Sequence, residues 1–279
     1  MRIVINYAGS STMKDTSTLV YTKANKAAWD ASAHLHGQGS SWDELLVAAS
    51  QPSFNVLDDC LIATLNHIGV VGRSAVQIGC NNARELLSLA ALGAKPSLGI
   101  DQSSQFLAQG AELASKANLN PRLIEANIYE LPTGLGQYDL GLITIGVINW
   151  MPDLQGFFKA VRGLISKGGI LVIYETHPIL EIFNPDSANP YLPEMSYFEK
   201  TPVKIEEAIT YDGTSGGVGE TGYWFVHTLG EIVTACASNG FQIQRLEEHP
   251  HLNREEEYAI YENQPAQLPL CYTLVAQAL

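Results

Sequence analysis

From about residue 74 onward, short runs of apolar residues alternate with longer stretches in which apolar and polar positions follow a helical period. The apolar runs predict five strands, at residues 74–78, 97–100, 122–126, 138–145 and 170–174. The amphipathic stretches between them predict helices at residues 83–92, 103–117 and 153–166. Strands that are apolar on both faces are typical of a parallel sheet covered by helices on each side. The pattern therefore predicts an α/β fold with a doubly wound, mostly parallel sheet and right-handed crossovers.

The two flanks of this core have a different pattern. Before it, a loose arm ending near residue 17 precedes predicted helices at residues 21–33, 42–50 and 56–68. After it, residues 178–224 break the alternation, which resumes with a helix at 228–239 and strands at 241–248 and 271–276. We therefore divide the chain into an N-terminal arm and helical lid (1–70), a core (71–177), an inserted cap (178–226) and a C-terminal part of the sheet (227–279). Within the cap, the run TSGGVGETG at 214–222 predicts a mobile loop or a hairpin tip.

The turn after the first predicted strand, Gly79-Cys80-Asn81-Asn82, leads into the N-terminus of a helix. A helix N-terminus carries free backbone N–H groups and a partial positive charge. Gly79 permits a close approach of the backbone, and Asn81 and Asn82 tolerate left-handed dihedral angles. The turn therefore predicts a place for the polar end of a ligand, although an ordinary strand–helix turn has the same sequence.

Asp101 follows the second predicted strand, at the edge of the sheet where ligands of open α/β folds bind. Its two carboxylate oxygens can accept hydrogen bonds from both hydroxyls of a ribose, and a capping Asp that faces solvent is the alternative. Asn81 and Arg84 stand where a dinucleotide motif G-x-G-x-x-G requires glycine. This disfavours NAD and FAD and suits a nucleoside cofactor without a diphosphate.

Five segments in order carry a resemblance to a known family. They are VQIGCNNARELLSLAALGA (76–94), GIDQS (99–103), EANIYELP (125–132), YDLGLITIGVINWMPDL (138–154) and FFKAVRGLISKGGILVIYETHP (157–178). With them, residues 75–178 resemble the class I S-adenosylmethionine-dependent methyltransferases, especially the bacterial small-molecule type. The preceding ANKAAWDASAHLH (24–36) resembles the lid helix of that family.

The resemblance implies a Rossmann-like sheet with an antiparallel last strand, and an enzyme that uses S-adenosylmethionine and releases S-adenosylhomocysteine. Residues 71–177 would form the cofactor-binding core. The implied cofactor contacts are Gly79, Cys80 and Asn81 at the methionine end, Asp101 and Gln102 at the ribose, Asn127 and Ile128 at the adenine, and Ile145 and Gly146 beneath the sulfonium. The family often has Gly at positions 81 and 83 and Asp at 127. An Asn127 amide can still accept a hydrogen bond from the adenine amino group.

For the acceptor side we consider bases and aromatic side chains. Glu175 and His177 follow the fifth strand and are candidate bases, together with His227. The alternative for either histidine is a structural hydrogen bond to the backbone, at a strand end for His177 and before the apparent helix cap Thr228 for His227. Candidate substrate contacts are the aromatic residues Tyr21, Trp29, Trp150 and Tyr223, which also suit a hydrophobic core.

The composition limits the classes of molecule that the protein is expected to bind. The chain has 29 Asp and Glu against 16 Lys and Arg, a formal net charge of -13, which repels nucleic acid and mildly favours neutral or cationic substrates. Its four cysteines form no C-x-x-C pair, so no metal site is expected and a reducing compartment fits. The N-terminus lacks the apolar stretch of a signal peptide, and no apolar run approaches the roughly 18 residues of a membrane span. We expect a cytoplasmic protein without a membrane partner and leave a homodimer open.

Two hypotheses of function remain. The first is an enzyme that transfers a methyl group to O, N, C or S of a small molecule by in-line displacement. The second is a regulatory or scaffold protein that binds S-adenosylmethionine without catalysis, because Asn81, Ala83 and Asn127 depart from the usual motifs. The missing glycines disfavour a third, an NAD-dependent reductase.

Overall fold

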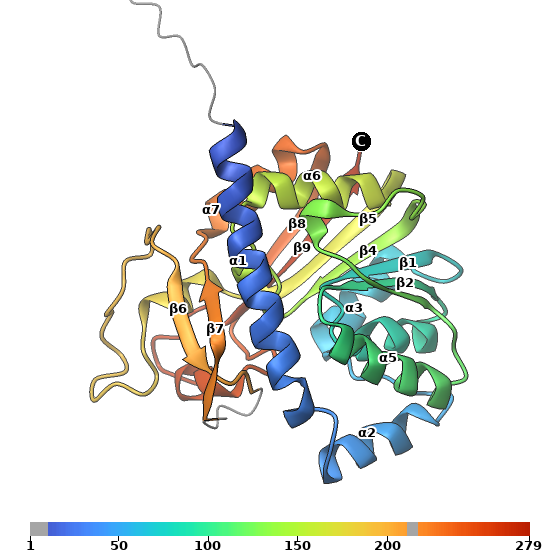
Figure 1. Cartoon of the computed structure of the whole chain (residues 1–279), viewed down its shortest axis with the longest axis horizontal. Helices are drawn as coiled ribbons and strands as arrows, with labels where there is room; N and C mark the ends of the chain where they lie inside the picture. Colours follow the sequence, from blue (N-terminus) through green and yellow to red (C-terminus); the bar gives the residue numbers. More distant parts are fainter. Residues whose placement is uncertain (1–10, 211–216) are drawn as a thin grey trace, which may run out of the picture.

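The computed structural model describes residues 11–210 and 217–279, which form one seven-stranded sheet with helices on both faces and a two-stranded hairpin beside it (Figure 1). The large sheet has the order β3-β2-β1-β4-β5-β9-β8. Its strands are β1 (Ser74–Ile78), β2 (Lys95–Asp101), β3 (Arg122–Glu125), β4 (Tyr138–Thr144), β5 (Ile165–Thr176), β8 (Phe241–His249) and β9 (Cys271–Ala278). The first five are parallel and β9 is antiparallel to both neighbours. The predicted mostly parallel sheet with an antiparallel last strand is confirmed.

Helices cover the sheet because alternate residues of each buried strand point to opposite faces. Val76 and Ile78 of β1 join one apolar cluster with α6 (Leu154–Leu164) and α7 (Leu229–Ser238). Ala75 joins a second cluster on the other face. That face is covered by α3 (Asp59–Ile68), α4 (Arg84–Ser88) and α5 (Ser104–Lys116), with α2 (Ser40–Ala49) packed outside α5. None of the helices described is long and apolar enough to cross a membrane.

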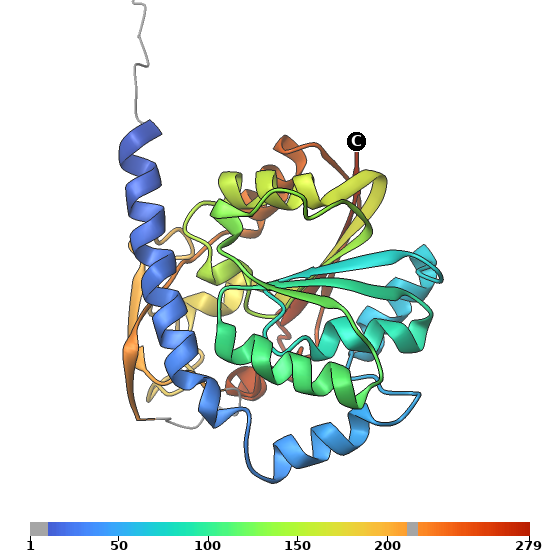
Figure 2. The same ribbon diagram turned by 45° about the vertical axis from the view of Figure 1, so that its right-hand side comes forward.

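The first helix, α1 (Ser11–Ser32), begins earlier than predicted and runs beside the hairpin (Figure 2). The loose arm predicted up to residue 17 is therefore wrong for residues 11–17, and the remainder of that arm lies outside the described residues. Asn25 fixes the helix: its amide oxygen accepts from the Tyr223 N–H at 2.6 Å, and its amide nitrogen donates to the carbonyls of Tyr223 and Trp150. The helix thus joins the hairpin to the core.

Residues 167–169, which lie between the predicted helix and the predicted fifth strand, form a bulge inside β5. Tyr138 pairs with Ile165 and Leu140 with Ile170, so β5 has more residues than β4 over this stretch. Gly168 has φ +78°, a left-handed conformation that suits the bulged position. The fifth strand therefore begins at Ile165 rather than at residue 170.

The cap region contains β6 (Val203–Glu207) and β7 (Val218–Trp224), which pair antiparallel. Residues 218–222 of the predicted loop or hairpin tip belong to β7; the 214–216 part lies outside the described residues. A short helical segment, η6 (Glu256–Tyr261), lies between β8 and β9, where the sequence pattern predicted no element. Together with the hairpin, η6 lies over the edge of the sheet where the parallel strands have their carboxyl ends.

Candidate active site

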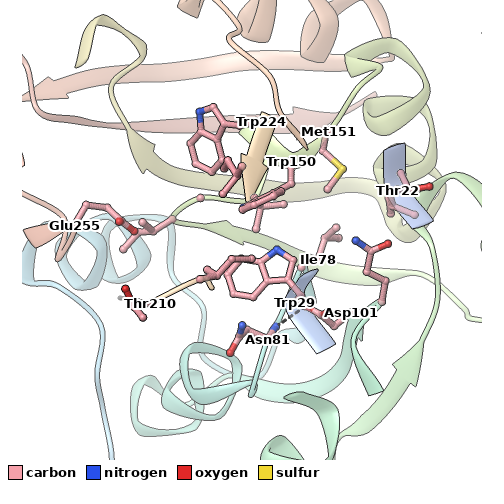
Figure 3. Close-up of a pocket in the computed structure, with 18 of the residues that line it drawn as sticks. Thr22, Trp29, Ile78, Asn81, Asp101, Trp150, Met151, Thr210, Trp224 and Glu255 are labelled. Carbon is pink, nitrogen blue, oxygen red and sulfur yellow. Dashed lines mark hydrogen bonds between the residues drawn. The ribbon is translucent and has the colours of Figure 1, made fainter. Parts of the chain in front are cut away.

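A cavity of about 670 Å³ lies at the carboxyl ends of β1, β2 and β4, between the sheet, α1, the hairpin and η6. It opens at the switch point of the sheet, where β1 lies between β2 and β4. Its volume is within the range of ligand pockets. Figure 3 shows Asp101 and Thr22 toward one end and Glu255 and Thr210 toward the other, with Trp29 and Trp150 between them.

The turn after β1 forms one wall of this cavity. Gly79 has φ +64°, and a Cβ there would lie 2.6 Å from a methyl carbon of Val147. Asn81 and Ala83 also have left-handed backbones, with φ of +50° and +59°. For Ala83 this conformation costs about 1 kcal/mol, which explains why glycine suits the position. The turn brings its backbone against the cavity without a side chain at Gly79.

Asp101 ties this turn to the next loop. Its Oδ2 accepts from the Asn81 N–H at 2.7 Å, and its Oδ1 accepts from the Ser103 N–H at 2.8 Å. Burial raises the pKa of Asp101 above its usual value, and these two N–H groups act against that rise. A carboxylate has about four acceptor positions, so Asp101 keeps capacity for a further donor. The residue lines the cavity and fits a ribose with two hydroxyls.

Asn127 and Ile128 line the same end of the cavity. The Asn127 amide oxygen accepts from the Tyr129 N–H at 3.1 Å, and its nitrogen donates to the Thr22 hydroxyl of α1 at 2.9 Å. The amide oxygen keeps one lone pair for a further donor. The first helix therefore closes this end of the cavity through Asn127.

Glu175 lies behind the loop that follows β4. Its carboxylate accepts from the N–H groups of Gly146 at 2.6 Å and Ile148 at 3.1 Å. The side chain is 1% exposed, and burial raises the pKa of Glu175 to about 8. Ile145 and Gly146 line the cavity whereas Glu175 does not. The carboxyl group therefore holds the backbone of this loop in place from the side away from the cavity.

The other candidate bases also lie outside the lining. His177 accepts from the Ile179 N–H at its Nδ1, and its Nε2 lies 2.9 Å from a Glu248 oxygen. The His227 Nε2 donates to the Met151 carbonyl at 2.8 Å. Burial lowers the pKa of both histidines, which favours their neutral forms.

Of the remaining predicted residues, Gln102, Trp29 and Trp150 line the cavity. Cys80 is fully buried below the turn. Tyr21 packs edge-on against Tyr223, with ring centroids 4.9 Å apart, and neither lines the cavity.

The structure adds residues that the sequence analysis did not assign to the site. Trp224 continues the aromatic wall, with its ring centroid 5.2 Å from that of Trp150 at an angle of 86°. Its Nε1 donates to the buried Glu181 at 2.8 Å, which fixes the ring. The segment at η6 contributes Glu255, Glu257 and Tyr258, which no local motif marks. Within residues 11–210 and 217–279, no group of three or more His, Cys, Asp or Glu side chains is placed to hold a metal ion.

Comparisons with known proteins agree with this geometry. The model of a methyltransferase domain family matches residues 76–173. By fold, the chain is similar to an S-adenosylmethionine-dependent methyltransferase from Clostridium acetobutylicum, 12% identical, with 95% of this chain and 99% of that chain covered and a TM-score of 0.54. A magnesium protoporphyrin IX methyltransferase from Synechocystis with bound S-adenosylhomocysteine is 16% identical, with 94% and 99% covered and a TM-score of 0.54. A methyltransferase from Mesorhizobium loti is 17% identical, with 77% and 96% covered and a TM-score of 0.52. No curated protein sequence matches the chain.

At these identities the solved structures establish the fold, and the family model adds the activity. The matched segment contains the turn after β1, Asp101 and the loop that Glu175 supports. These parts fit S-adenosylmethionine: the turn lines the cavity with no side chain at Gly79, and the Asp101 carboxylate lines it with acceptor oxygens. Residues 76–173 therefore match a methyltransferase domain, the whole chain has the fold of S-adenosylmethionine-dependent methyltransferases, and the cavity has features that suit S-adenosylmethionine as a methyl donor.

Proposed function

We propose that this methyltransferase acts on a small molecule that binds beyond the cofactor in the same cavity. One observation carries the proposal: a single space of about 670 Å³ extends from Asp101 to Glu255 and is walled by Trp29, Trp150 and Trp224 (Figure 3). A nucleoside occupies the Asp101 end in this proposal, which leaves the aromatic end for the acceptor. Aromatic side chains give a small acceptor large contact areas at fixed positions.

The cofactor supplies an already activated methyl group, so the protein's own residues chiefly hold and align. In this proposal Asp101 binds the ribose, and Asn127 and Ile128 contact the adenine. The turn at Gly79 and Asn81 holds the methionine end, and Gln102 lies near the ribose. Ile145 and Gly146 form the floor. Alignment and exclusion of water together account for rate enhancements of this kind.

The three candidate bases have structural rather than catalytic roles in the proposal. Glu175 and His227 do not line the cavity, and each binds a backbone group of the segment after β4, whereas His177 contacts Ile179 and Glu248. Each would have to leave these partners to reach an acceptor. We therefore assign none of them a proton transfer, and methyl transfer rests on positioning.

Calorimetry with S-adenosylhomocysteine tests the cofactor part of the site. Asp101→Asn keeps one carbonyl oxygen for a backbone N–H but loses the charge, and we expect its affinity to fall by at least tenfold. Glu206→Gln is the matched control because Glu206 is exposed on β6 and pairs with Lys204 outside the cavity. Equal affinities for Asp101→Asn and the wild type would exclude the ribose contact.

Formation of S-adenosylhomocysteine with a panel of small acceptors tests the catalytic part. Turnover with any of them excludes a purely regulatory binding protein. If the cofactor binds and only protein or nucleic-acid acceptors support turnover, the small-molecule proposal is wrong.

A further inference from the structure

The charged side chains that line the cavity are all acidic. Five carboxylate side chains of the described chain line the cavity, and no Lys, Arg or His side chain does; the acids are Asp101, Asp186, Glu207, Glu255 and Glu257. Asp101 is held by two backbone N–H groups at the nucleoside end. The other four come from the cap and the η6 segment. The acceptor end is therefore negative without a cation of its own.

Glu255 is the most enclosed of these four. Within the described residues, its carboxylate accepts no hydrogen bond. It also borders a smaller space of about 70 Å³ beside Gly79 and Asn81. Burial, followed by the charge of Glu257, raises the pKa of Glu255 to about 7. The side chain is partly exposed and lines the cavity, so its oxygens can accept a hydrogen bond from a donor on a bound ligand.

The cations nearest to Glu255 have other partners. The Arg254 guanidinium lies 3.2 Å from an Asp58 oxygen and 3.5 Å from a Glu85 oxygen. Arg84 pairs with Glu85 at 2.9 Å. Both arginines attract Glu255 only at longer range, which partly opposes the rise in its pKa. Among residues 11–210 and 217–279, Glu255 thus has no direct ion pair that would neutralise its charge.

Aromatic rings line the same cavity as this carboxylate. Trp150 and Trp224 are packed edge to face, and Tyr258 lines the cavity next to Glu257. A ring face attracts a cation by about 0.5–2 kcal/mol, and a carboxylate adds a charge-assisted hydrogen bond. Together they favour a positively charged nitrogen and disfavour an anion at the same place.

We propose that the methyl acceptor carries a protonated amine on an aromatic or apolar frame, with the ammonium bound at Glu255 and the frame against Trp150 and Trp224. This substrate class rests on the methyl transfer proposed above. The nitrogen that Glu255 binds sets the orientation of the acceptor and is independent of which of its atoms receives the methyl group.

Calorimetry on the full chain saturated with S-adenosylhomocysteine tests the substrate class with three indole compounds. Tryptamine, tryptophol and indole-3-propionate share a frame and end in an ammonium, a hydroxyl and a carboxylate. We expect tryptamine to bind at least tenfold more tightly than tryptophol, and indole-3-propionate to bind most weakly. Glu255→Gln should reduce the ratio between tryptamine and tryptophol to threefold or less, whereas Glu206→Gln should leave it unchanged.

Four results would overturn the inference while leaving the methyltransferase function intact. They are equal affinities for the amine and the alcohol, a ratio that Glu255→Gln leaves unchanged, a ratio that Glu206→Gln lowers equally, and no binding of any probe at millimolar concentration. Glu255→Gln that weakens S-adenosylhomocysteine instead of tryptamine would assign this carboxylate to the cofactor and also overturn it. Failure of S-adenosylhomocysteine to bind the wild type would instead remove the proposed function itself.

Discussion

Replacing Glu175 separates a supporting carboxyl group from a catalytic one. Glu175→Ala removes the acceptor for the N–H groups of Gly146 and Ile148. Ile148 is 1% exposed, so its N–H has no access to water and its loss of a partner costs about 1–3 kcal/mol. Gly146 borders the cavity, where water can replace the carboxylate as acceptor. The loss of its hydrogen bond therefore costs less free energy than that of Ile148. We therefore expect the free energy of unfolding to fall by about 2–4 kcal/mol.

Glu175→Gln keeps the size of the side chain and has no charge. Because burial raises the pKa of Glu175 to about 8, the wild-type group is mostly protonated at neutral pH. The amide imitates that neutral form, and its oxygen still accepts from one N–H. We expect the free energy of unfolding of Glu175→Gln to fall by less than about 1.5 kcal/mol at pH 7 and most of the activity to remain. Stability and activity should both fall much further in Glu175→Ala.

The dependence on pH gives an independent measurement. An ordinary glutamate ionises near 4.5, so between about pH 4.5 and 8 the folded protein holds a proton on Glu175 that the unfolded chain has released. The free energy of unfolding therefore falls as pH rises through this window, by up to about 1.4 kcal/mol per pH unit from this residue. Glu181 and Glu255, with pKa values raised by burial to about 7, contribute in the same direction.

Urea unfolding at pH 5.5, 6.5 and 7.5 tests both statements, with turnover measured on the same samples. The free energy of unfolding of Glu175→Gln should rise relative to that of the wild type with each step up in pH, whereas that of the partly exposed Glu247→Gln should follow the wild type. Parallel stability curves for Glu175→Gln and the wild type would refute the raised pKa. A large loss of turnover in Glu175→Gln, without loss of stability or of cofactor affinity, would indicate that Glu175 has a catalytic role.

Further predictions follow from the backbone near the site. Gly79→Ala places a Cβ 2.6 Å from Val147 at φ +64° and should weaken S-adenosylhomocysteine binding by at least tenfold in calorimetry; unchanged affinity would show that the turn does not contact the cofactor. Ala83→Gly relieves a left-handed alanine and should raise the free energy of unfolding by up to about 1 kcal/mol, with a decrease refuting the strain. Asn25→Ala removes hydrogen bonds from α1 to Trp150 and Tyr223 and should speed limited proteolysis of that helix; an unchanged rate would show that Asn25 does not anchor it.

Much of the core could be predicted because buried parallel strands are apolar on both faces. The five predicted strands and the turn at Gly79 follow from local pattern alone. The start of α1 could not, because residues 11–20 are mostly polar and their helix is supported by α1 packing against β7. The bulge at Gly168 is set by the register between β4 and β5, which one strand's sequence does not contain.

The Asp101 end of the cavity was easier to predict from the sequence than the Glu255 end for a physical reason. Asp101 and Asn127 follow strands whose ends must meet at one edge of the sheet. Glu255 and Tyr258 come from a segment between the last two strands, and only the folded chain brings them to Gly79. Glu175 did carry a signal, since a glutamate that ends the apolar run ILVIY cannot easily stay charged when buried. What the sequence could not reveal is that its partners are the N–H groups of Gly146 and Ile148.

Local charge, rather than the net charge of -13, would select an amine in this cavity. At physiological ionic strength, exposed charges are screened beyond about 8 Å, so most of the acidic surface has little effect on a bound molecule. Glu255 lies within the cavity wall and is screened far less. Raising the salt from about 0.05 to 0.5 M should therefore slow association of tryptamine, which depends on the general field. The preference for tryptamine over tryptophol should persist at high salt in the wild type, and its disappearance there would mean that the exposed acids, and not Glu255, produce it.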